Sequence, residues 1–377
     1  MNVELAAAIA KSDALHQRAR SWVAAYEAGD EETASNWDSF ARDLAAFQFE
    51  VNPHFRKLCE RRGVKPNDGF ERLPPIPTDA FKLARISCFP AELTTKTFRT
   101  SGTTIGDRGM HAFRDVGTYD RGAVAYGRAM LFAGMTPPPA VLVFGPCPAA
   151  APDSSLTHMC GLFAEQLGGM PPAHRVQDAF FLDDGVFDLA GFDKRVVHSM
   201  VRGEPVVVLG TSFSFVHLLD ELGDTTLALP AQSRVMQTGG FKGKSREVDG
   251  PLLRRRIATL FGIEEASVVS EYGMTELSSQ FYDEDVPDHG RLYREPPWAR
   301  VVPVDPETLA PVRDGEVGIA RIEDLLNIDS ACILLTEDRV RRIAGVPGHF
   351  ELLGRRPGAS PRGCSIAIDE LLARDDH

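Results

Sequence analysis

The chain has 377 residues, and its 53 acidic residues outnumber its 41 lysines and arginines, for a formal net charge of −12. This balance argues against nucleic acid or an anionic membrane surface as the main partner, because both need a basic footprint. No apolar run approaches the roughly 20 residues of a bilayer span, and the first residues lack a signal-peptide pattern. We therefore expect a cytoplasmic protein without a membrane span or a nucleic-acid partner, and the composition leaves a homodimer open.

The N-terminal part of the chain predicts helices. Residues 2–28 form one helical stretch, and a second begins at Trp37, where large apolar residues recur every three or four positions. Pro53 is expected to close the second helix. Four prolines within residues 66–77 predict an extended connector. We therefore assign residues 1–70 to a helical N-terminal segment.

A different pattern follows, in which short apolar runs alternate with helical stretches. The runs at 141–144, 206–209 and 268–269 each end near a glycine or a small polar residue. Such alternation predicts an α/β core with a largely parallel sheet, which we assign to residues 71–285. The three consecutive arginines 254–256 are expected to form a solvated helix face. The helices are expected at about 118–133, 156–168, 191–203, 213–222 and 247–261.

The last part of the chain predicts a smaller β-rich subdomain, residues 286–377. Strands are expected at 315–322, 331–335 and 349–353, with turn residues between them. A short helix at 365–373 would follow.

Two glycine-rich segments are candidates for a phosphate site. Residues 100–109 hold four hydroxyls and three glycines, and glycine lets the backbone approach a ligand while N–H groups and hydroxyls form an anion cradle. No GK[ST] closes this loop, so it is not a Walker loop. Residues 238–244, with lysines at 242 and 244, form a weaker candidate. The alternatives are a polar surface turn and a plain glycine-rich loop.

Residues 270–276 form a third candidate, because they follow an apolar run and ligands bind beyond the carboxyl ends of strands in open α/β sheets. Tyr272 would stack on a base, Gly273 would allow close approach, Thr275 would meet phosphate and Glu276 would hold Mg²⁺. The alternative is a helix N-cap in which Thr275 and Glu276 serve only the first turn.

Taken in order, these segments resemble the adenylate-forming (acyl-CoA synthetase-like) superfamily. Thr336–Arg339 and Gly354–Arg355 match two further segments of that superfamily. Within it the chain is most similar to the short LuxE-type acyl-protein synthetases, and also to the EhpF-like adenylating enzymes of phenazine pathways. The further marks of this likeness are Ile76-Pro77, Phe81-Lys82, His111, Thr238–Lys244 and Arg362–Ser365.

The resemblance implies the N-terminal domain of the adenylate-forming fold, with parallel sheets, flanking helices and a small β-rich subdomain. Only 22 residues follow Arg355, so we expect the family's mobile C-terminal domain to be absent or vestigial. That domain carries a lysine that contacts the acyl carboxylate. Lys242, Lys244 or a partner protein would replace it, or the chain adenylates without it.

The implied activity is ATP-dependent conversion of a carboxylic acid to acyl-AMP, with release of pyrophosphate and transfer to an acceptor. The acid would be a fatty acid or an aromatic acid of a natural-product pathway. ATP and Mg²⁺ are the implied cofactors, with Glu276 as metal ligand. The residues implied to bind the nucleotide are Thr100, Ser101, Gly102, Thr103, Thr104, Gly239, Gly240, Tyr272, Gly273, Asp338 and Arg355, and those implied to act in catalysis are Thr275, Glu276, Lys242 and Cys364.

The acyl acceptor is left open between a protein thiol, a partner reductase and a small nucleophile. Cys364 is a candidate thiol, because it precedes the helix expected at 365–373 and follows Arg362, and both would favour the thiolate. The alternative is a small packed residue. The remaining cysteines, none in CxxC spacing, are expected to be buried and structural.

Substrate contacts are predicted for Gly273, Met274, His158 and Phe213. His158 lies at a predicted helix start and Phe213 follows a predicted strand, and packing or capping roles are the alternatives for both. The same alternative holds for His111. A nucleotide-binding, non-catalytic partner subunit of a reductase or biosynthetic complex is the competing function.

Overall fold

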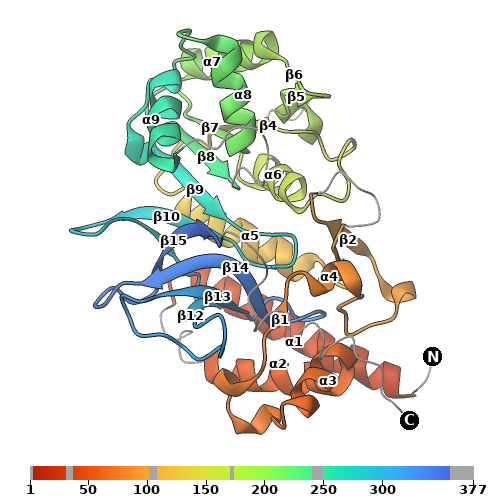
Figure 1. The fold of residues 1–377 in the computed structure, drawn as a ribbon. Coiled ribbons are helices and arrows are strands. Elements are labelled where there is room, and N and C mark those ends of the chain that lie inside the picture. Colours follow the sequence, from red (N-terminus) through yellow and green to blue (C-terminus); the bar gives the residue numbers. More distant parts are fainter. Residues whose placement is uncertain (1–2, 31–36, 102–107, 170–173, 240–248, 357–377) are drawn as a thin grey trace. The chain divides into compact units, whose positions relative to one another are not determined.

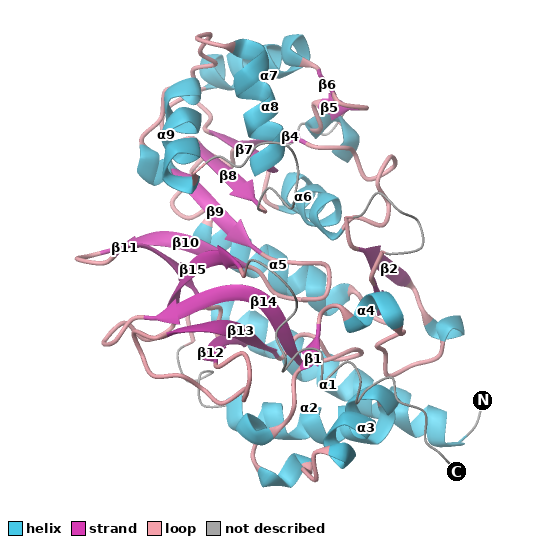
Figure 2. Ribbon diagram, in the orientation of Figure 1, coloured by secondary structure: helices cyan, strands magenta, loops and turns pink. Residues whose placement is uncertain are grey.

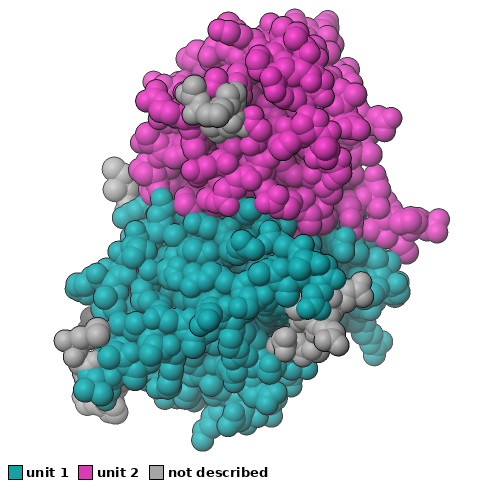
Figure 3. All heavy atoms as spheres, turned by 180° about the vertical axis from the view of Figure 1, so that it is seen from behind, with its two compact units in different colours: residues 1–125, 274–279, 292–377 teal, residues 126–273, 280–291 magenta. Residues whose placement is uncertain are grey.

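A computed structural model describes residues 3–30, 37–101, 108–169, 174–239 and 249–356 (Figure 1). The chain divides into two compact units, which Figure 3 distinguishes by colour. Unit 1 holds residues 1–125, 274–279 and 292–377, and unit 2 holds residues 126–273 and 280–291. The chain therefore passes between the units four times. The division at residues 70 and 285 that the sequence suggested stays a prediction.

Unit 1 begins with helices, as predicted (Figure 2). The apolar face that was expected from Trp37 onward is buried. Pro53 ends one helix, as expected, and also starts the next, whose N-terminus is capped by the Asn52 side chain. The predicted connector 66–77 contains two short 3₁₀ turns before its last two residues pair as a strand. The helices are α1 (Val3–Glu27), α2 (Trp37–Val51), α3 (Pro53–Arg61) and α4 (Ala80–Leu83), and α5 (Gly117–Met130) crosses into unit 2.

The sheet of unit 1 is antiparallel, with one short parallel strand added. Its strand order is β12-β13-β14-β15-β11, and β1 pairs in parallel with β14. A separate hairpin joins β2 to β3. The strand expected at 331–335 is only the start of β14, which runs on to Arg342 through polar residues that broke the apolar pattern. The strands are β1 (Ile76–Pro77), β2 (Lys96–Arg99), β3 (Met110–Phe113), β11 (Gly290–Arg294), β12 (Ala299–Val304), β13 (Val317–Asp324), β14 (Ile333–Arg342) and β15 (His349–Arg355).

Unit 2 is built on the predicted parallel sheet. Its strand order is β10-β9-β8-β7-β4, in which only β10 is antiparallel to its neighbour. The helices around it enclose an aromatic core that includes Phe144, Phe192, Phe215 and Phe261. The strands are β4 (Ala140–Phe144), β7 (Val206–Thr211), β8 (Arg234–Thr238), β9 (Val268–Tyr272) and β10 (Phe281–Val286), with a small hairpin of β5 (Leu182–Asp183) and β6 (Val186–Phe187). The helices are α6 (Ser155–Gln166), α7 (Leu189–Arg202), α8 (Ser212–Leu222) and α9 (Gly250–Phe261).

Two side-chain expectations were wrong. Arg254 is not part of a solvated face, because its guanidinium bonds the Asp283 carboxylate and donates to Ser270 Oγ over 2.8 Å. The helical period turns Arg254 toward β9 and leaves Arg255 exposed. Cys147 is half-buried, whereas the other four cysteines that the structure describes are buried as expected. Within the described ranges, no helix is both long and apolar enough to cross a membrane.

Candidate functional site

The predicted phosphate loop is closed at its neck by Thr100 and Gly109. The Thr100 N–H donates to Gly109 O over 3.0 Å, and the Gly109 N–H donates to Thr100 Oγ1 over 2.8 Å. Arg108 Nε donates to Thr100 O over 2.6 Å. The Thr100 hydroxyl oxygen therefore shapes the neck, and Ser101 beyond it is exposed.

The turn at Thr275–Glu276 lies against this neck, although the two segments are far apart in sequence. Thr275 Oγ1 is 3.5 Å from Arg99 O. His111 Nδ1 is 2.8 Å from Thr275 O, and Asn327 Nδ2 donates to Glu276 O over 2.8 Å. Residues 277–280 lead from the turn into β10 without a helix, so the N-cap alternative for this motif is wrong. The Glu276 side chain is buried.

Asp324 holds the chain directly after this turn. Its carboxylate accepts from the Ser278 N–H and from the Ser279 hydroxyl, each over 2.7 Å. Burial raises the pKa of Asp324 to about 6, and the bonds from Ser279, Ser278 and Leu326 oppose the rise. Sequence reasoning missed Asp324 and Asn327, because the stretch of mixed polar and apolar residues around them matches no motif.

The two predicted ribose contacts, Asp338 and Arg355, face each other across β14 and β15. Asp338 lies in a bulge of β14, since Ile319 pairs with Arg339 but Arg321 pairs with Leu335. The Asp338 N–H donates to Thr336 Oγ1 over 3.0 Å, which ties the bulge together. On β15 the register shifts again at Gly354, whose φ is +78°. The Arg355 guanidinium pairs with the Glu337 carboxylate, with Nη2 and Oε2 3.0 Å apart.

Residues 76–82, which carry part of the family resemblance, pack against β14 and β3. β1 pairs with β14 just before its bulge. The Phe81 ring meets the His111 ring edge-on, with centroids 5.8 Å apart. A Cβ added to Gly109 would lie 3.4 Å from Phe81 Cβ, so α4, which carries Phe81, supports the loop neck. This part of the resemblance thus has a structural basis within unit 1.

The first residues of the predicted segment 270–276 form the end of β9 in unit 2. Glu271 is buried and accepts a hydrogen bond from the Thr238 hydroxyl at the end of β8. Burial raises the pKa of Glu271 to about 7, and the bond from Thr238 opposes the rise. A Cβ on Gly273 would collide with Glu271 Oε1, so a side chain at this position would have to displace the end of the Glu271 side chain. Tyr272 is buried against the Phe281 ring.

The other predicted contacts of unit 2 lie on helix starts and loops. His158 is half-buried in the first turn of α6, and Phe213 is 45% exposed in the first turn of α8. The alternative prediction for Phe213, packing in the core, is therefore wrong. Gly239 has a φ of +77°, and its carbonyl accepts from Ser212 Oγ over 2.7 Å. Met274, in unit 1, is half-buried.

Several predicted residues lie outside the part of the chain that the structure describes: Gly102, Thr103, Thr104, Gly240, Lys242, Lys244 and Cys364. Among the described residues, no group of three or more His, Cys, Asp and Glu side chains could hold a metal ion. A single carboxylate such as that of Glu276 is enough for a Mg²⁺ ion that is bound mainly through nucleotide phosphates, because this ion often uses one or two carboxylates beside phosphate oxygens.

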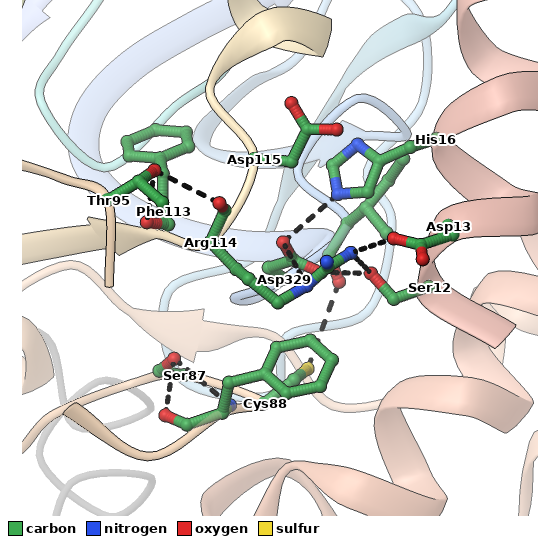
Figure 4. Close-up of polar contacts among 12 residues, drawn as sticks. Ser12, Asp13, His16, Ser87, Cys88, Thr95, Phe113, Arg114, Asp115 and Asp329 are labelled. Atoms are coloured by element: carbon green, nitrogen blue, oxygen red, sulfur yellow. Dashed lines mark hydrogen bonds and ion pairs between the residues drawn. The ribbon is translucent and has the colours of Figure 1, made fainter. Parts of the chain in front are cut away.

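The loop that carries Asn327 is tied to the N-terminal helix. Figure 4 shows Ser12 and His16 of α1 pointing toward Asp329, with Arg114 beside them. Ser12 Oγ donates to Asp329 Oδ1 over 2.6 Å, and His16 Nε2 lies 3.0 Å from Asp329 Oδ2. The Asp329 backbone carbonyl accepts from the Cys88 N–H over 2.9 Å. α1 therefore fixes the loop two residues away from Asn327.

This fold is similar to solved structures of 2-hydroxyisobutyryl-CoA ligase. The open conformation in complex with 2-HIB-AMP and CoA has a TM-score of 0.58 at 16% identity, and the match covers 87% of this chain and 70% of that chain. The thioesterification state has a TM-score of 0.59 at 17% identity, over 86% and 68%. The chain thus shares the fold of this CoA ligase, which confirms the predicted α/β class.

Residues 180–373, just over half of the chain, match the family model described as acyl-protein synthetase, LuxE. The chain belongs to this LuxE family, as the sequence marks indicated. Two relatives are each named long-chain-fatty-acid–luciferin-component ligase. The one from Aliivibrio fischeri is 22% identical over 354 residues, which cover 90% of this chain and 89% of the relative. The one from Vibrio harveyi is 23% identical over 345 residues, which cover 88% and 86%.

Proposed function

We propose that this chain uses ATP to convert a carboxylic acid to acyl-AMP, releases pyrophosphate and passes the acyl group to an acceptor. The observation that carries the proposal is the meeting of the phosphate-loop neck with the Thr275–Glu276 turn, where Thr275 Oγ1 is 3.5 Å from Arg99 O. Membership of the LuxE family supports it. The competing function, a nucleotide-binding partner subunit, needs the same nucleotide contacts but no turnover.

The reaction requires two anions to be held together while charge develops on phosphorus. A carboxylate oxygen attacks the α-phosphorus, the new P–O bond forms, and pyrophosphate leaves with the electrons of the broken bond. We assign phosphate binding to the hydroxyls and N–H groups of the loop from Thr100 and to Thr275. Tyr272 would stack on adenine, and Asp338 with Arg355 would hold the ribose. Glu276 would hold Mg²⁺, which neutralises phosphate charge.

For the acid we favour a long-chain fatty acid, because both curated relatives carry that substrate in their names. An aromatic acid is the alternative. Phe213, Met274 and His158 are the proposed acyl contacts, and Phe213 offers an exposed ring in the first turn of α8. We also infer a cytoplasmic location from the sequence features above, and a homodimer stays a prediction.

The test is pyrophosphate release with ATP and Mg²⁺ across fatty, benzoic and phenazine-type carboxylic acids. We expect release with fatty acids and its loss, to background, in Glu276→Ala. Glu265→Ala, which removes an exposed carboxylate of unit 2, is the matched control and should keep full activity. ATP binding without release for any acid would contradict adenylation and favour the partner-subunit function. Release in Glu276→Ala would remove Glu276 from the site.

For the acceptor we propose the Cys364 thiolate. Its sulfur would attack the acyl carbonyl of acyl-AMP, so that a C–S bond forms, the C–O bond to phosphate breaks and AMP leaves. Intact-protein mass spectrometry should then show one acyl group on the wild type and none on Cys364→Ser, with pyrophosphate release still present. Cys147→Ser, at a half-buried cysteine, should still be acylated. Equal acylation of both variants would place the acceptor elsewhere.

A further inference from the structure

The contacts of His111 contain one proton too few when its ring is neutral. A neutral imidazole has one donor and one acceptor nitrogen, and an amide side chain has one donor and one acceptor end. Nδ1 faces Thr275 O at 2.8 Å, so it must donate. Asn327 uses its NH₂ group on Glu276 O, so its Oδ1 faces His111 Nε2 at 3.0 Å. Two acceptors then face each other across that contact.

Turning the Asn327 amide does not remove the conflict. Its NH₂ group would then donate to Nε2, but Oδ1 would face the Glu276 carbonyl, which is also an acceptor. Only the imidazolium form, with a proton on each nitrogen, satisfies Thr275 O and Asn327 Oδ1 while Asn327 still donates to Glu276 O. The neutral ring with its proton on Nδ1 satisfies both backbone carbonyls but leaves Nε2 facing Asn327 Oδ1 without a proton, so every contact of the His111–Asn327 pair is satisfied only when His111 carries a charge.

The surroundings oppose that charge as long as no anion is near. His111 is 1% exposed and packs against the Phe113 ring, with centroids 4.0 Å apart. Burial lowers the pKa of His111 to about 4, while the bonds to Thr275 and Asn327 and the charge of Asp329 raise it. At neutral pH the ring is then uncharged, and one contact of the pair His111–Asn327 lacks its proton.

We propose that His111 takes up a proton when the nucleotide phosphate binds beside Thr275, and that the imidazolium then fixes the backbone of the Thr275–Glu276 turn. This inference rests on the proposed function, because it places phosphate at Thr275. His111 is thus a positioning residue, which acts through the carbonyl of Thr275 and through Asn327. The incoming negative charge favours the imidazolium, since opposite charges stabilise the charged form.

Charged groups lie on each element packed around His111. Asp329 belongs to the loop of Asn327, Asp324 ends β13 directly before that loop, and Glu276 belongs to the turn itself. Arg99 lies on β2, whose Phe98 pairs with His111, and Lys82 follows Phe81 on α4. The charge of Asp329 raises the pKa of His111.

The test is the number of protons taken up on binding of AMP, a ligand that needs no metal ion. It is measured by calorimetry of the full chain at pH 6 in two buffers of different ionisation enthalpy. We expect the wild type to take up more protons per AMP than His111→Gln. Protons taken up by the ligand and by all other groups are the same in both proteins and cancel in the difference. His54→Gln is the matched control, because burial also lowers the pKa of His54, and it should behave as the wild type.

Equal proton uptake by the wild type and by His111→Gln, with AMP bound to both, would overturn the inference and leave the proposed function intact. No binding of AMP or ATP to the wild type would overturn both. If His111→Gln does not fold, NMR of ¹³Cε1-labelled histidine in the wild type decides. The histidine that titrates lowest should move to a higher pKa with AMP, and an unchanged value would contradict the proposal.

Discussion

Glu271 and Gly273 show how a single side chain shapes the predicted motif in unit 2. The Glu271 carboxyl occupies the space that a Cβ of residue 273 would need, 2.3 Å away. It is also buried at the end of β9 beside Thr238. A substitution at Gly273 therefore acts first on Glu271, and only through it on anything bound nearby.

Glu271→Gln should flatten the dependence of stability on pH. The pKa of Glu271 is about 7 in the folded protein against an ordinary 4.5, so its contribution is complete below pH 4.5 and is lost as the pH rises through 7. Glutamine does not titrate. The fall in the free energy of unfolding between pH 5 and pH 8 should shrink by about 2–3 kcal/mol. Urea unfolding at both pH values measures it.

Glu265→Gln is the control for this experiment, because Glu265 is exposed and should leave the wild-type dependence on pH unchanged. If the free energy of unfolding fell equally between pH 5 and pH 8 in the wild type and in Glu271→Gln, Glu271 would be ionised in the folded protein at pH 5.

Among the elements, the strands β14 and β15 are irregular at the two proposed ribose contacts. Asp338 stands in a bulge of β14, and Arg355 follows Gly354, where β15 shifts its register. Apolar alternation located the starts of both strands. It did not reveal the bulges, because a bulge depends on pairing with the neighbouring strand and leaves no periodic signal in its own residues.

Gly354→Ala should cost about 1–2 kcal/mol of stability, because the φ of +78° is unfavourable for a residue with a Cβ. It should also weaken AMP binding, since relaxation of the bulge would move Arg355. Calorimetry and urea unfolding report the two effects separately. Gly29→Ala is the matched control, because Gly29 has a φ of +74° two residues after the end of α1.

The control should lose similar stability and keep the wild-type affinity for AMP. Loss of stability in Gly354→Ala without any loss of affinity would show that the bulge does not position Arg355 for a nucleotide.

At the scale of the whole molecule, distant segments meet at Asp329. α1 reaches it through Ser12 and His16, and the Cys88 N–H donates to its carbonyl. The side chains of His16 and Asp329 are only 3% and 4% exposed. Removal of one member of such a buried group leaves its partners unsatisfied, which is more costly than loss of a surface ion pair.

Asp329→Asn should therefore lower the free energy of unfolding by about 3–5 kcal/mol. Lys11→Ala is the control on the same helix, because Lys11 pairs with Glu50 at the surface, and it should cost less than about 1 kcal/mol. Denaturant unfolding at constant pH compares the two. Equal, small losses would mean that α1 is not fixed through Asp329.

The sequence predicted the helices and the parallel strands of unit 2. Periodicity and turn residues are local signals, and the motifs occur in the order of a known family. Asn327 and Asp324 could not be predicted, because their roles arise only when the loop before β14 folds against the turn. Arg254 was misread for a similar reason, since its partner Asp283 lies on β10.

The assembly of the turn also has a consequence for the time course of folding. His111 and Thr275 are 164 positions apart, and Glu276 depends on Asn327, a further 51 positions along. Closing a loop of the first length costs roughly 4–5 kcal/mol of chain entropy before any contact repays it. Local helices form long before such contacts. In refolding, far-ultraviolet circular dichroism should therefore recover well before the capacity to bind AMP, and during synthesis this capacity cannot arise until residue 327 has left the ribosome.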